Sequence, residues 1–280
     1  MDFGTIVGLI LGFGAIFIAG YVGGTDPHVI FGRWEALVLI IGGTLGATVT
    51  SFPVRTFTRG FFGGLRTAFT EVNYHERDVI TTLVSFAEKA RREGLLALEN
   101  EAAALEDDFM RKGIQLVIDG RDTEIIRKVL ETEVSNTQEQ GTKAEAVFTS
   151  LGGYSPTLGI IGTVLGLIGM LKGLSTMGNS SNVAGSIGVA TAQAFVATFF
   201  GIMFANLLWL PIGTKIKERN GQLMLLREIM IEGILAIQAG DNPRLLEEKL
   251  LAFLDPKERD TEIDEGGAMH GEADYSPKPA

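Results

Sequence analysis

Long runs without a charged side chain are the feature that most limits how this chain can fold. Four such runs contain no Asp, Glu, Lys, Arg or His: residues 3–22, 36–52, 146–171 and 173–214. A helix that crosses the hydrocarbon core of a bilayer needs about 20 apolar residues. The last run is too long for one crossing, and its polar segment MGNSSN predicts a turn. We therefore expect four membrane-spanning helices, near 3–22, 32–52, 148–171 and 186–211.

Basic residues are unevenly distributed around these expected spans. The connections 22–31 and 173–185 contain no Lys or Arg. Two basic clusters follow the second and fourth spans: Arg55, Arg59 and Arg66, and Lys215, Lys217 and Arg219. Because Lys and Arg are enriched in cytoplasmic loops, both termini and the long segment 53–147 are predicted to be cytoplasmic. A cleaved signal peptide is the alternative for the first run, but Asp2 stands where such a peptide carries basic residues.

The pattern between and after the spans is helical. Apolar residues recur at helical spacing around Ile80 and Leu83, and Gly113, Gly120 and Gly141 are interpreted as ends of helices. The predicted fold class is an all-α integral membrane protein, with a cytoplasmic helical domain between its second and third membrane helices. The predicted divisions are a first membrane pair, the cytoplasmic domain, a second membrane pair, C-terminal cytoplasmic helices and an acidic disordered tail: 1–52, 53–147, 148–212, 213–254 and 255–280.

Composition argues against several classes of function. The chain has no Cys, and its histidines, His28, His75 and His270, show no metal-ligand spacing. The formal net charge of −10 argues against binding to nucleic acid. Neither a phosphate-binding loop nor a nucleophile elbow is present. We expect neither an enzyme nor a resident metal or cofactor.

Small residues and prolines mark the spans. Glycines recur at four-residue intervals, at Gly4, Gly8 and Gly12, at Gly42 and Gly46, and at Gly162 and Gly166. Such rows let membrane helices approach closely, although glycine is frequent in membrane helices generally. Pro156 lies near the start of the third span and Pro211 at the end of the fourth. Each proline either bends or ends its helix, or serves as a hinge at the cytoplasmic membrane end.

The third and fourth spans contain hydroxyl groups but no ionisable side chain. Thr163 lies in the third span, and Thr191 and Thr198 lie in the fourth. Proteins that move protons through a membrane usually place an ionisable group inside it. If this chain conducts ions through these threonines, a partner must supply the acid. The alternative is that the threonines only hydrogen-bond to helix carbonyls.

Three segments resemble the MotA family of flagellar-motor stator subunits. They are KARREGLLALE at 89–99, SPTLGIIGTVLGLIGML at 155–171 and REIMIEGILAIQAGDNPRLLEEKL at 227–250. The resemblance extends over the chain up to about residue 254 and includes the pattern of two short connections and one long one. It implies a ring of MotA-type subunits, taken to be a pentamer, around two copies of a MotB-type partner. That partner has one membrane span with an aspartate and a domain that binds peptidoglycan.

The resemblance also implies roles for individual residues. Pro156 and Pro211 match the prolines that couple ion passage to conformational change. Arg91, Arg92 and Glu99 match the charged positions that engage the rotor protein FliG; without the resemblance, the arginines are interpreted as an ordinary solvated helix face. The implied location is the bacterial inner membrane.

The resemblance leaves the coupling ion and two alternatives open. Thr163 and Thr198 match sodium-type relatives, so the resemblance favours Na⁺ over H⁺ as the coupling ion. Ala197 departs from the sodium-type pattern, because those relatives often have a second threonine at that position. One alternative function is an ExbB/TolQ-type energising subunit, which usually has three spans. The other is a membrane scaffold that binds a cytoplasmic partner and conducts no ion.

Overall fold

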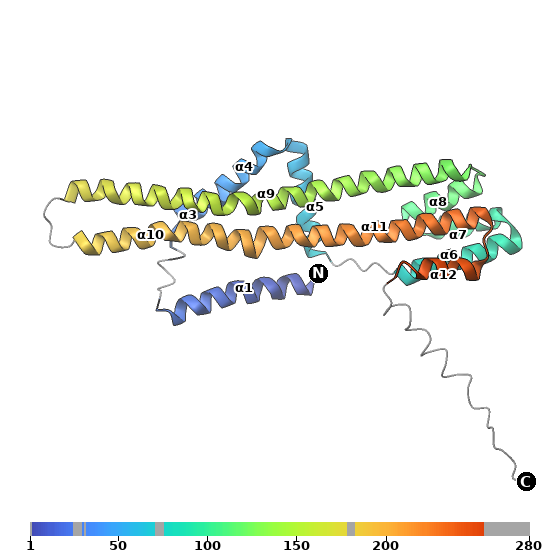
Figure 1. The fold of residues 1–280 in the computed structure, drawn as a ribbon, viewed down its shortest axis with the longest axis horizontal. Coiled ribbons are helices and arrows are strands. Elements are labelled where there is room, and N and C mark those ends of the chain that lie inside the picture. The colour runs from blue at the N-terminus through green and yellow to red at the C-terminus, as the bar shows by residue number, and fades with distance from the viewer. Residues whose placement is uncertain (1, 25–29, 31, 71–75, 178–182, 255–280) are drawn as a thin grey trace, which may run out of the picture. The chain divides into compact units, whose positions relative to one another are not determined.

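The computed structural model describes residues 2–24, 30, 32–70, 76–177 and 183–254. The acidic segment 255–280, the three histidines and most of the expected MGNSSN turn lie outside the described residues. Within the described ranges the regular structure is entirely helical, with no strand, and the predicted all-α fold class is confirmed (Figure 1). The chain forms two compact units. The first comprises Met1–Val72 and Thr137–Gly221, and the second comprises Asn73–Asn136 and the residues from Gln222 onward.

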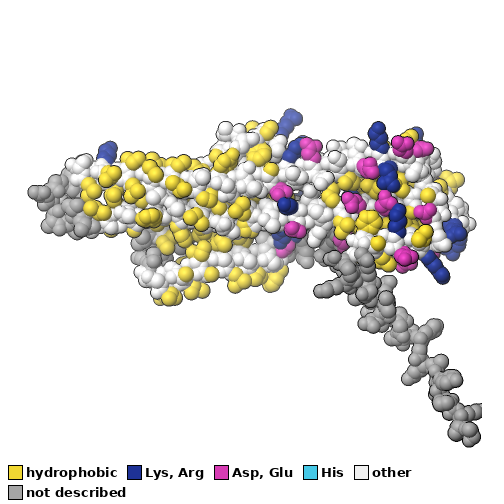
Figure 2. Space-filling view, in the orientation of Figure 1, with side chains coloured by type: hydrophobic (Ala, Val, Ile, Leu, Met, Phe, Trp, Pro, Cys, Tyr) yellow, Lys and Arg dark blue, Asp and Glu magenta, His cyan; other side chains and the backbone are white. Residues whose placement is uncertain are grey.

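The first unit contains the apolar helices. Its elements, with two π-helical turns η1 and η3, are α1 (Phe3–Val22), α3 (Trp34–Leu37), η1 (Val38–Gly42), α4 (Gly43–Ser51), α5 (Val54–Phe69), the second part of α9 (Thr123–Met177), α10 (Val183–Phe204), η3 (Ala205–Trp209) and the beginning of α11 (Leu210–Ala239). Four described helical stretches are long and apolar enough to cross a membrane, within Phe3–Val22, Trp34–Ser51, Thr123–Ser175 and Gly185–Ala239. Figure 2 shows hydrophobic side chains over α1 and over the α9 and α10 segments. These stretches correspond to the four expected spans, although the second is shorter at both ends than the expected 32–52.

Pro211 does not end its helix, so the interpretation of this proline as a helix terminator is wrong. The helical path continues from α10 through η3 into α11, and Pro211 is the second residue of α11. A proline lacks the N–H that would bond to the carbonyl four residues earlier, and its ring clashes with that carbonyl. The wide turn η3 ends at Trp209, two residues before Pro211, and it accommodates the ring without breaking the helix.

The glycine rows have different surroundings. A Cβ atom added at Gly162 or Gly166 would collide with α10, so close packing at this pair is confirmed. At Gly8, Gly42 and Gly46 an added Cβ would meet no described atom within 4 Å. These three positions therefore do not serve close packing within this chain.

Aromatic side chains form the core of the first unit where α5 crosses α9 and α11. Phe148 and Leu151 of α9 are fully buried, and Trp209 and Ile216 of the η3–α11 path are buried beside them. The rings of Phe61 and Phe148 stack with centroids 5.6 Å apart. This core fixes α5 to the unit that contains the spans, although residues 53–69 were expected to belong to the cytoplasmic domain.

The second unit is a charged helical bundle. It contains α6 (Glu76–Glu93), the 3₁₀ turn η2 (Leu95–Leu98), α7 (Glu99–Ala104), α8 (Asp108–Ile118), the beginning of α9, the second part of α11 and α12 (Pro243–Leu251). Ile80, Leu83, Ile114 and Ile234 are among its buried side chains, as the helical spacing predicts for the first two.

Two of the three glycines interpreted as helix ends lie inside helices instead. Gly120, with φ of 68°, follows the end of α8. Gly113 lies within α8, where an added Cβ would be 2.4 Å from Ile234. Gly141 lies within α9, where an added Cβ would be 2.2 Å from the side chain of Asn220. Close packing, rather than a change in chain direction, explains glycine at both positions.

Candidate functional site

Helices α9 and α10 meet along a seam of small residues. A Cβ atom at Gly162 would lie 2.5 Å from the Cβ atom of Ala197, and one at Gly166 would lie 2.7 Å from that of Ala194. Distances this short are below van der Waals contact, so only glycine fits at these positions. Small residues of this kind allow helix backbones to pack closely in lipid.

At the end nearest Pro156 the seam is a contact between the two helix backbones. A Cβ atom at Gly201 would lie 2.6 Å from the carbonyl oxygen of Ser155 and 3.0 Å from the Cα atom of Gly159. The buried Ser155 hydroxyl donates a hydrogen bond of 2.9 Å to the carbonyl of Gly201. The two backbones are therefore in direct contact, and Pro156 directly follows the residue that joins them.

Two of the predicted threonines come together on this seam. The hydroxyl of Thr163 contacts the hydroxyl of Thr198, and both lie 3.2 Å from the carbonyl oxygen of Gly159. Thr163 also lies 3.2 Å from the carbonyl oxygen of Ala194. Both threonines are half-buried. The site thus gathers two hydroxyl and two carbonyl oxygens, the ligand types that hard cations prefer. The same contacts also agree with the alternative interpretation, in which the threonines only hydrogen-bond to helix carbonyls.

Thr191 lies apart from this pair. It is seven residues from Thr198 on α10, about 10 Å along the helix axis. Its hydroxyl contacts the sulfur of Met170 at 3.4 Å. The structure therefore brings together two of the three predicted threonines.

A cavity of about 380 Å³ adjoins the seam near Thr191. Its lining includes Gly166 and Met170 of α9, Gln193 of α10 and Arg33, the residue before α3. Gln193 is recognisable in the sequence as a polar amide within an uncharged run. Helical spacing alone, however, does not predict that it lies beside Arg33. The cavity is lined mostly by small and apolar residues, and Arg33 and Gln193 bring polar side chains to its wall.

The prolines lie on the facing α9 and α10–α11 paths. Pro156 is half-buried inside α9, and Pro211 is exposed near the beginning of α11. A Cβ atom at Gly152, one turn before Pro156, would lie 2.4 Å from the side chain of Leu210, which precedes Pro211. Both prolines thus border the same helix contact.

An ion cluster ties the beginning of α1 to α11. Asp2 caps α1 and forms ion pairs of 2.5 Å with Lys215 and 2.6 Å with Arg219. The Arg219 guanidinium is buried and also donates to the backbone carbonyls of Thr67 and Thr70, at the end of α5. One arginine therefore joins α1, α5 and α11 just beyond Pro211.

The environment of Asp2 favours its charged form. Donation from Lys215, with a hydrogen bond of 3.0 Å from the backbone N–H of Thr5, holds the pKa of the Asp2 carboxyl well below its usual range. The sequence carried no signal for this role, because Lys215 and Arg219 also match the ordinary basic flank of a membrane helix.

The predicted rotor-facing residues surround one turn of the second unit. Arg91 and Arg92 lie in the last turn of α6, and Glu99 begins α7. All three are exposed. Between them, Gly94 adopts a φ of 85°, and Leu98 of η2 is fully buried.

A partly exposed ion pair connects the helices on either side of this turn. Lys89 of α6 donates to Glu101 of α7 at 2.6 Å, which raises the pKa of the lysine. The fixed turn leaves the three exposed charges available to a partner. In the described residues none of the three has a hydrogen-bond or ion-pair partner.

These features define a polytopic helical membrane protein with a close-packed helix seam and a charged helical domain, and comparison with known proteins identifies the family. The sequence pattern of the MotA/TolQ/ExbB proton channel family matches residues 101–229. Motility protein A of Bacillus subtilis is 35% identical over 97% of this chain and 98% of its own length. Chemotaxis protein PomA of Vibrio alginolyticus is 32% identical over 95% of this chain and 100% of its own length.

Solved structures agree with these sequence relatives. A chain in the flagellar MotAB stator complex from Bacillus subtilis has a TM-score of 0.82 and 35% identity, and covers 91% of this chain and 98% of its own. A chain in the C. jejuni MotAB structure has a TM-score of 0.83 and 30% identity, and covers 91% and 97%. The chain belongs to the MotA family within the MotA/TolQ/ExbB group, and it is not an enzyme.

Proposed function

We propose that this chain is the ion-conducting stator subunit of a bacterial flagellar motor, which couples cation flow to torque on the rotor. The observation that carries the proposal is the α9–α10 seam, where the Thr163 and Thr198 hydroxyls meet in spans without a charged side chain. Relatives named Motility protein A support this function. Their similarity over nearly the whole chain favours it over the ExbB/TolQ alternative.

The missing acid comes from a partner in this proposal. A MotB-type subunit, with one span and a peptidoglycan-binding domain, supplies the aspartate that receives the ion. Two such subunits sit inside a ring of copies of this chain, taken to be a pentamer. The MotAB complexes among the similar structures support a partner of this kind.

The energy of each step comes from the ion. Moving one elementary charge through 100 mV supplies about 2.3 kcal/mol. Neutralising the partner's aspartate changes the cost of placing it among apolar helices, and the ring turns relative to the partner anchored in the cell wall. Pro156 and Pro211, on either side of the Gly152–Leu210 contact, allow the helix ends to bend as the aspartate changes its charge.

The rotor contact is the exposed turn between α6 and α7. Arg91, Arg92 and Glu99 engage the rotor protein FliG. Exposed ion pairs are worth about 0–1 kcal/mol each, so each contact is weak and breaks quickly. Such contacts suit a machine that steps along a rotor.

The proposed coupling ion is Na⁺, with H⁺ as the competing choice. The oxygens around Thr163 and Thr198 suit a cation, and the close approach of Ala197 to Gly162 leaves little room for a second threonine there. Thr163→Ala should lower the dependence of swimming speed on sodium concentration. Thr157→Ala, at an exposed position on the same helix, is the matched control. An unchanged sodium response in Thr163→Ala would favour H⁺.

The proposed location is the bacterial inner membrane, with both termini in the cytoplasm. The basic residues after the second and fourth spans support this orientation. Because the chain has no Cys, single cysteines introduced at Lys128 and Gly24 can be labelled in intact cells. Labelling from outside should reach position 24 and not position 128. The reverse result would contradict the orientation.

The stator role is tested by deleting the gene and restoring it. Cells without the gene should carry filaments that do not rotate, and the restored gene should recover swimming. A membrane scaffold that conducts no ion would tolerate bulky substitutions at Thr163 and Thr198 but not charge reversal at Arg91. Normal swimming with such bulky substitutions would therefore favour the scaffold.

A further inference from the structure

We propose that the outward face of α5 binds the head groups of anionic phospholipids in the cytoplasmic leaflet. The opposite face of the same helix fixes its position. Gly60 and Gly64 are buried against α9, where added Cβ atoms would lie 3.1 Å from Val147 and 2.5 Å from Phe148. Ala68 is fully buried in the same contact. Because this face of α5 is packed against α9, the opposite face of the helix must point away from α9.

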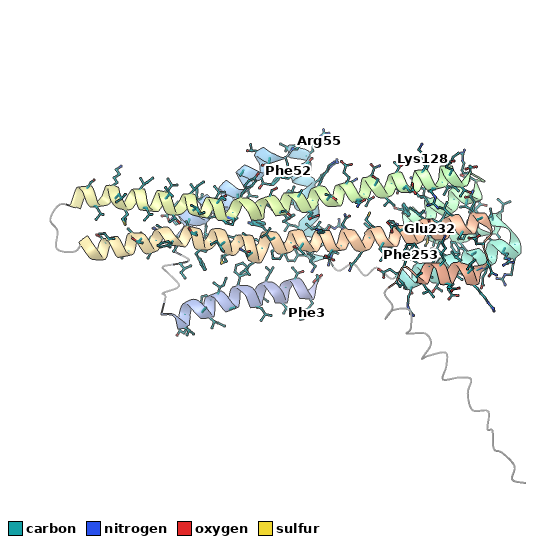
Figure 3. The ribbon with its side chains drawn as sticks, viewed as in Figure 1. Phe3, Phe52, Arg55, Lys128, Glu232 and Phe253 are labelled. Atoms are coloured by element: carbon teal, nitrogen blue, oxygen red, sulfur yellow. The ribbon has the colours of Figure 1, made fainter. Side chains whose placement is uncertain are left out.

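The outward face carries three arginines and one phenylalanine. Arg55, Arg59, Phe62 and Arg66 follow spacings of four, three and four residues, so they form one stripe on a helix. The arginines are exposed, and the Phe62 side chain is 67% exposed. Arg55 projects away from α9 and α11 in Figure 3. In the described residues these guanidinium groups have no hydrogen-bond or ion-pair partner, and residues 53–70 contain no acid.

The direction of α5 places this stripe at the membrane surface. The helix begins shortly after Ser51, the last residue of α4, and runs across α9 and α11 rather than along them (Figure 1). Its buried face packs on Phe148 and Ile216, at the ends of the third and fourth spans. A helix lying across the spans at this level presents its outer face to lipid head groups.

The chemistry of the stripe fits an anionic lipid. Guanidinium groups bind phosphate through paired hydrogen bonds, and an exposed aromatic ring favours the interface between head groups and acyl chains. A basic residue near an anionic leaflet gains about fivefold in affinity, the equivalent of about 1 kcal/mol. The inference rests on the proposed orientation, which puts α5 in the cytoplasmic leaflet. The competing occupant is a second copy of this chain, whose Glu145 or Glu218 would pair with the arginines.

The test measures lipid selectivity of the full chain, purified with its partner subunit, in phosphatidylcholine vesicles. Trace spin-labelled phosphatidylglycerol or phosphatidylcholine is added, and electron paramagnetic resonance gives the fraction held at the protein surface. Phosphatidylglycerol should be preferred, by about fivefold at each arginine position. Replacing Arg55, Arg59 and Arg66 by Gln should remove most of this preference, whereas replacing them by Lys should keep most of it.

The control variant removes three exposed basic residues from the second unit, Arg121, Lys128 and Arg244, by substitution with Gln. It should leave the preference unchanged. Raising salt to 1 M should also abolish the preference of the unmodified chain, because the Debye length falls to about 3 Å. This measurement decides the question even if the triple Gln variant does not insert.

Equal association of the two lipids with the unmodified chain would overturn the proposal. So would a preference that survives the triple Gln substitution. Loss of ring assembly in that variant with lipid selectivity intact would instead assign the face to a second copy. The stator function fails by a different result, normal swimming without the gene, which leaves the lipid measurement standing.

Discussion

The contact between Gly201 and Ser155 predicts a large difference between two chemically identical substitutions on α10. In Gly201→Ala, the new Cβ atom would start 2.6 Å from the Ser155 carbonyl oxygen, and real Cβ contacts are essentially never below 3.0 Å. The obstacle is backbone, so no side-chain rotation can relieve it. The helices must separate, which weakens the 2.9 Å hydrogen bond from the Ser155 hydroxyl to the Gly201 carbonyl.

The magnitude follows from three effects. Overpacking costs about 1–3 kcal/mol, and loss of the hydrogen bond costs about 0.5–1.5 kcal/mol. The higher helix propensity of alanine returns about 1 kcal/mol. Gly188→Ala is the control on α10, because its Cβ would meet no described atom within 4 Å, and it should be neutral or stabilising. Because both variants gain the helix propensity of alanine, they should differ by the sum of the two losses, about 1.5–4.5 kcal/mol.

The assay is thermal unfolding of the purified full chain, followed by tryptophan fluorescence at one heating rate. A difference of this size should lower the midpoint of Gly201→Ala by at least about 3 °C relative to Gly188→Ala. Gly153→Ala, at a second open position on α9, should behave like Gly188→Ala. Equal midpoints for Gly201→Ala and both controls would refute the close backbone contact.

Three further predictions concern Asp2 and the proposed coupling and rotor residues. Asp2→Asn should destabilise the chain by about 1–3 kcal/mol. The bond from Lys215 lowers the pKa of Asp2, so the stability that the charged carboxylate contributes is complete above pH 3.8, its ordinary pKa, and is lost as pH falls through the lowered pKa. The free energy of unfolding should therefore fall less steeply with acid in Asp2→Asn than in the unmodified chain. Parallel acid-unfolding curves would argue against a role for Asp2. Arg91→Glu should impair torque while co-purification with the partner subunit and ion conduction largely persist, and loss of assembly would contradict a rotor contact. Pro156→Leu should stop rotation in tethered cells without loss of the complex, and normal rotation would exclude the hinge.

The membrane helices could be predicted because one physical requirement, about 20 apolar residues for each crossing, leaves a direct mark on the sequence. The same mark identified Thr163 and Thr198 as polar groups in apolar surroundings. Their contact with each other could not be predicted in the same way. It depends on the rotation of α9 against α10, which the fit of Gly162 against Ala197 determines.

Glycine and proline show where local signals were ambiguous. A glycine in a helical pattern is equally consistent with a helix end and with a close contact, and the partner of Gly113, Ile234, lies on a distant helix. Pro211 carried the signal for a break, but the wide turn η3 keeps the helix continuous. At Gly113 a contact with a distant helix explains the glycine, and at Pro211 the preceding wide turn explains the continuous helix. Neither cause is visible in the local sequence pattern.

The ion cluster of Asp2, Lys215 and Arg219 has a consequence for the order in which the chain can fold during synthesis. Asp2 and Arg219 are 217 positions apart in the sequence, so the carboxylate leaves the ribosome long before either of its basic partners. Until α11 has been synthesised and inserted, α1 lacks these tertiary bonds, and Thr67 and Thr70 lack the guanidinium that their carbonyls accept from. Formation of these ion pairs therefore requires a chain that has been synthesised at least as far as Arg219. A nascent or truncated chain that stops before Arg219 should be recognisable to cellular quality control by its loose first helix.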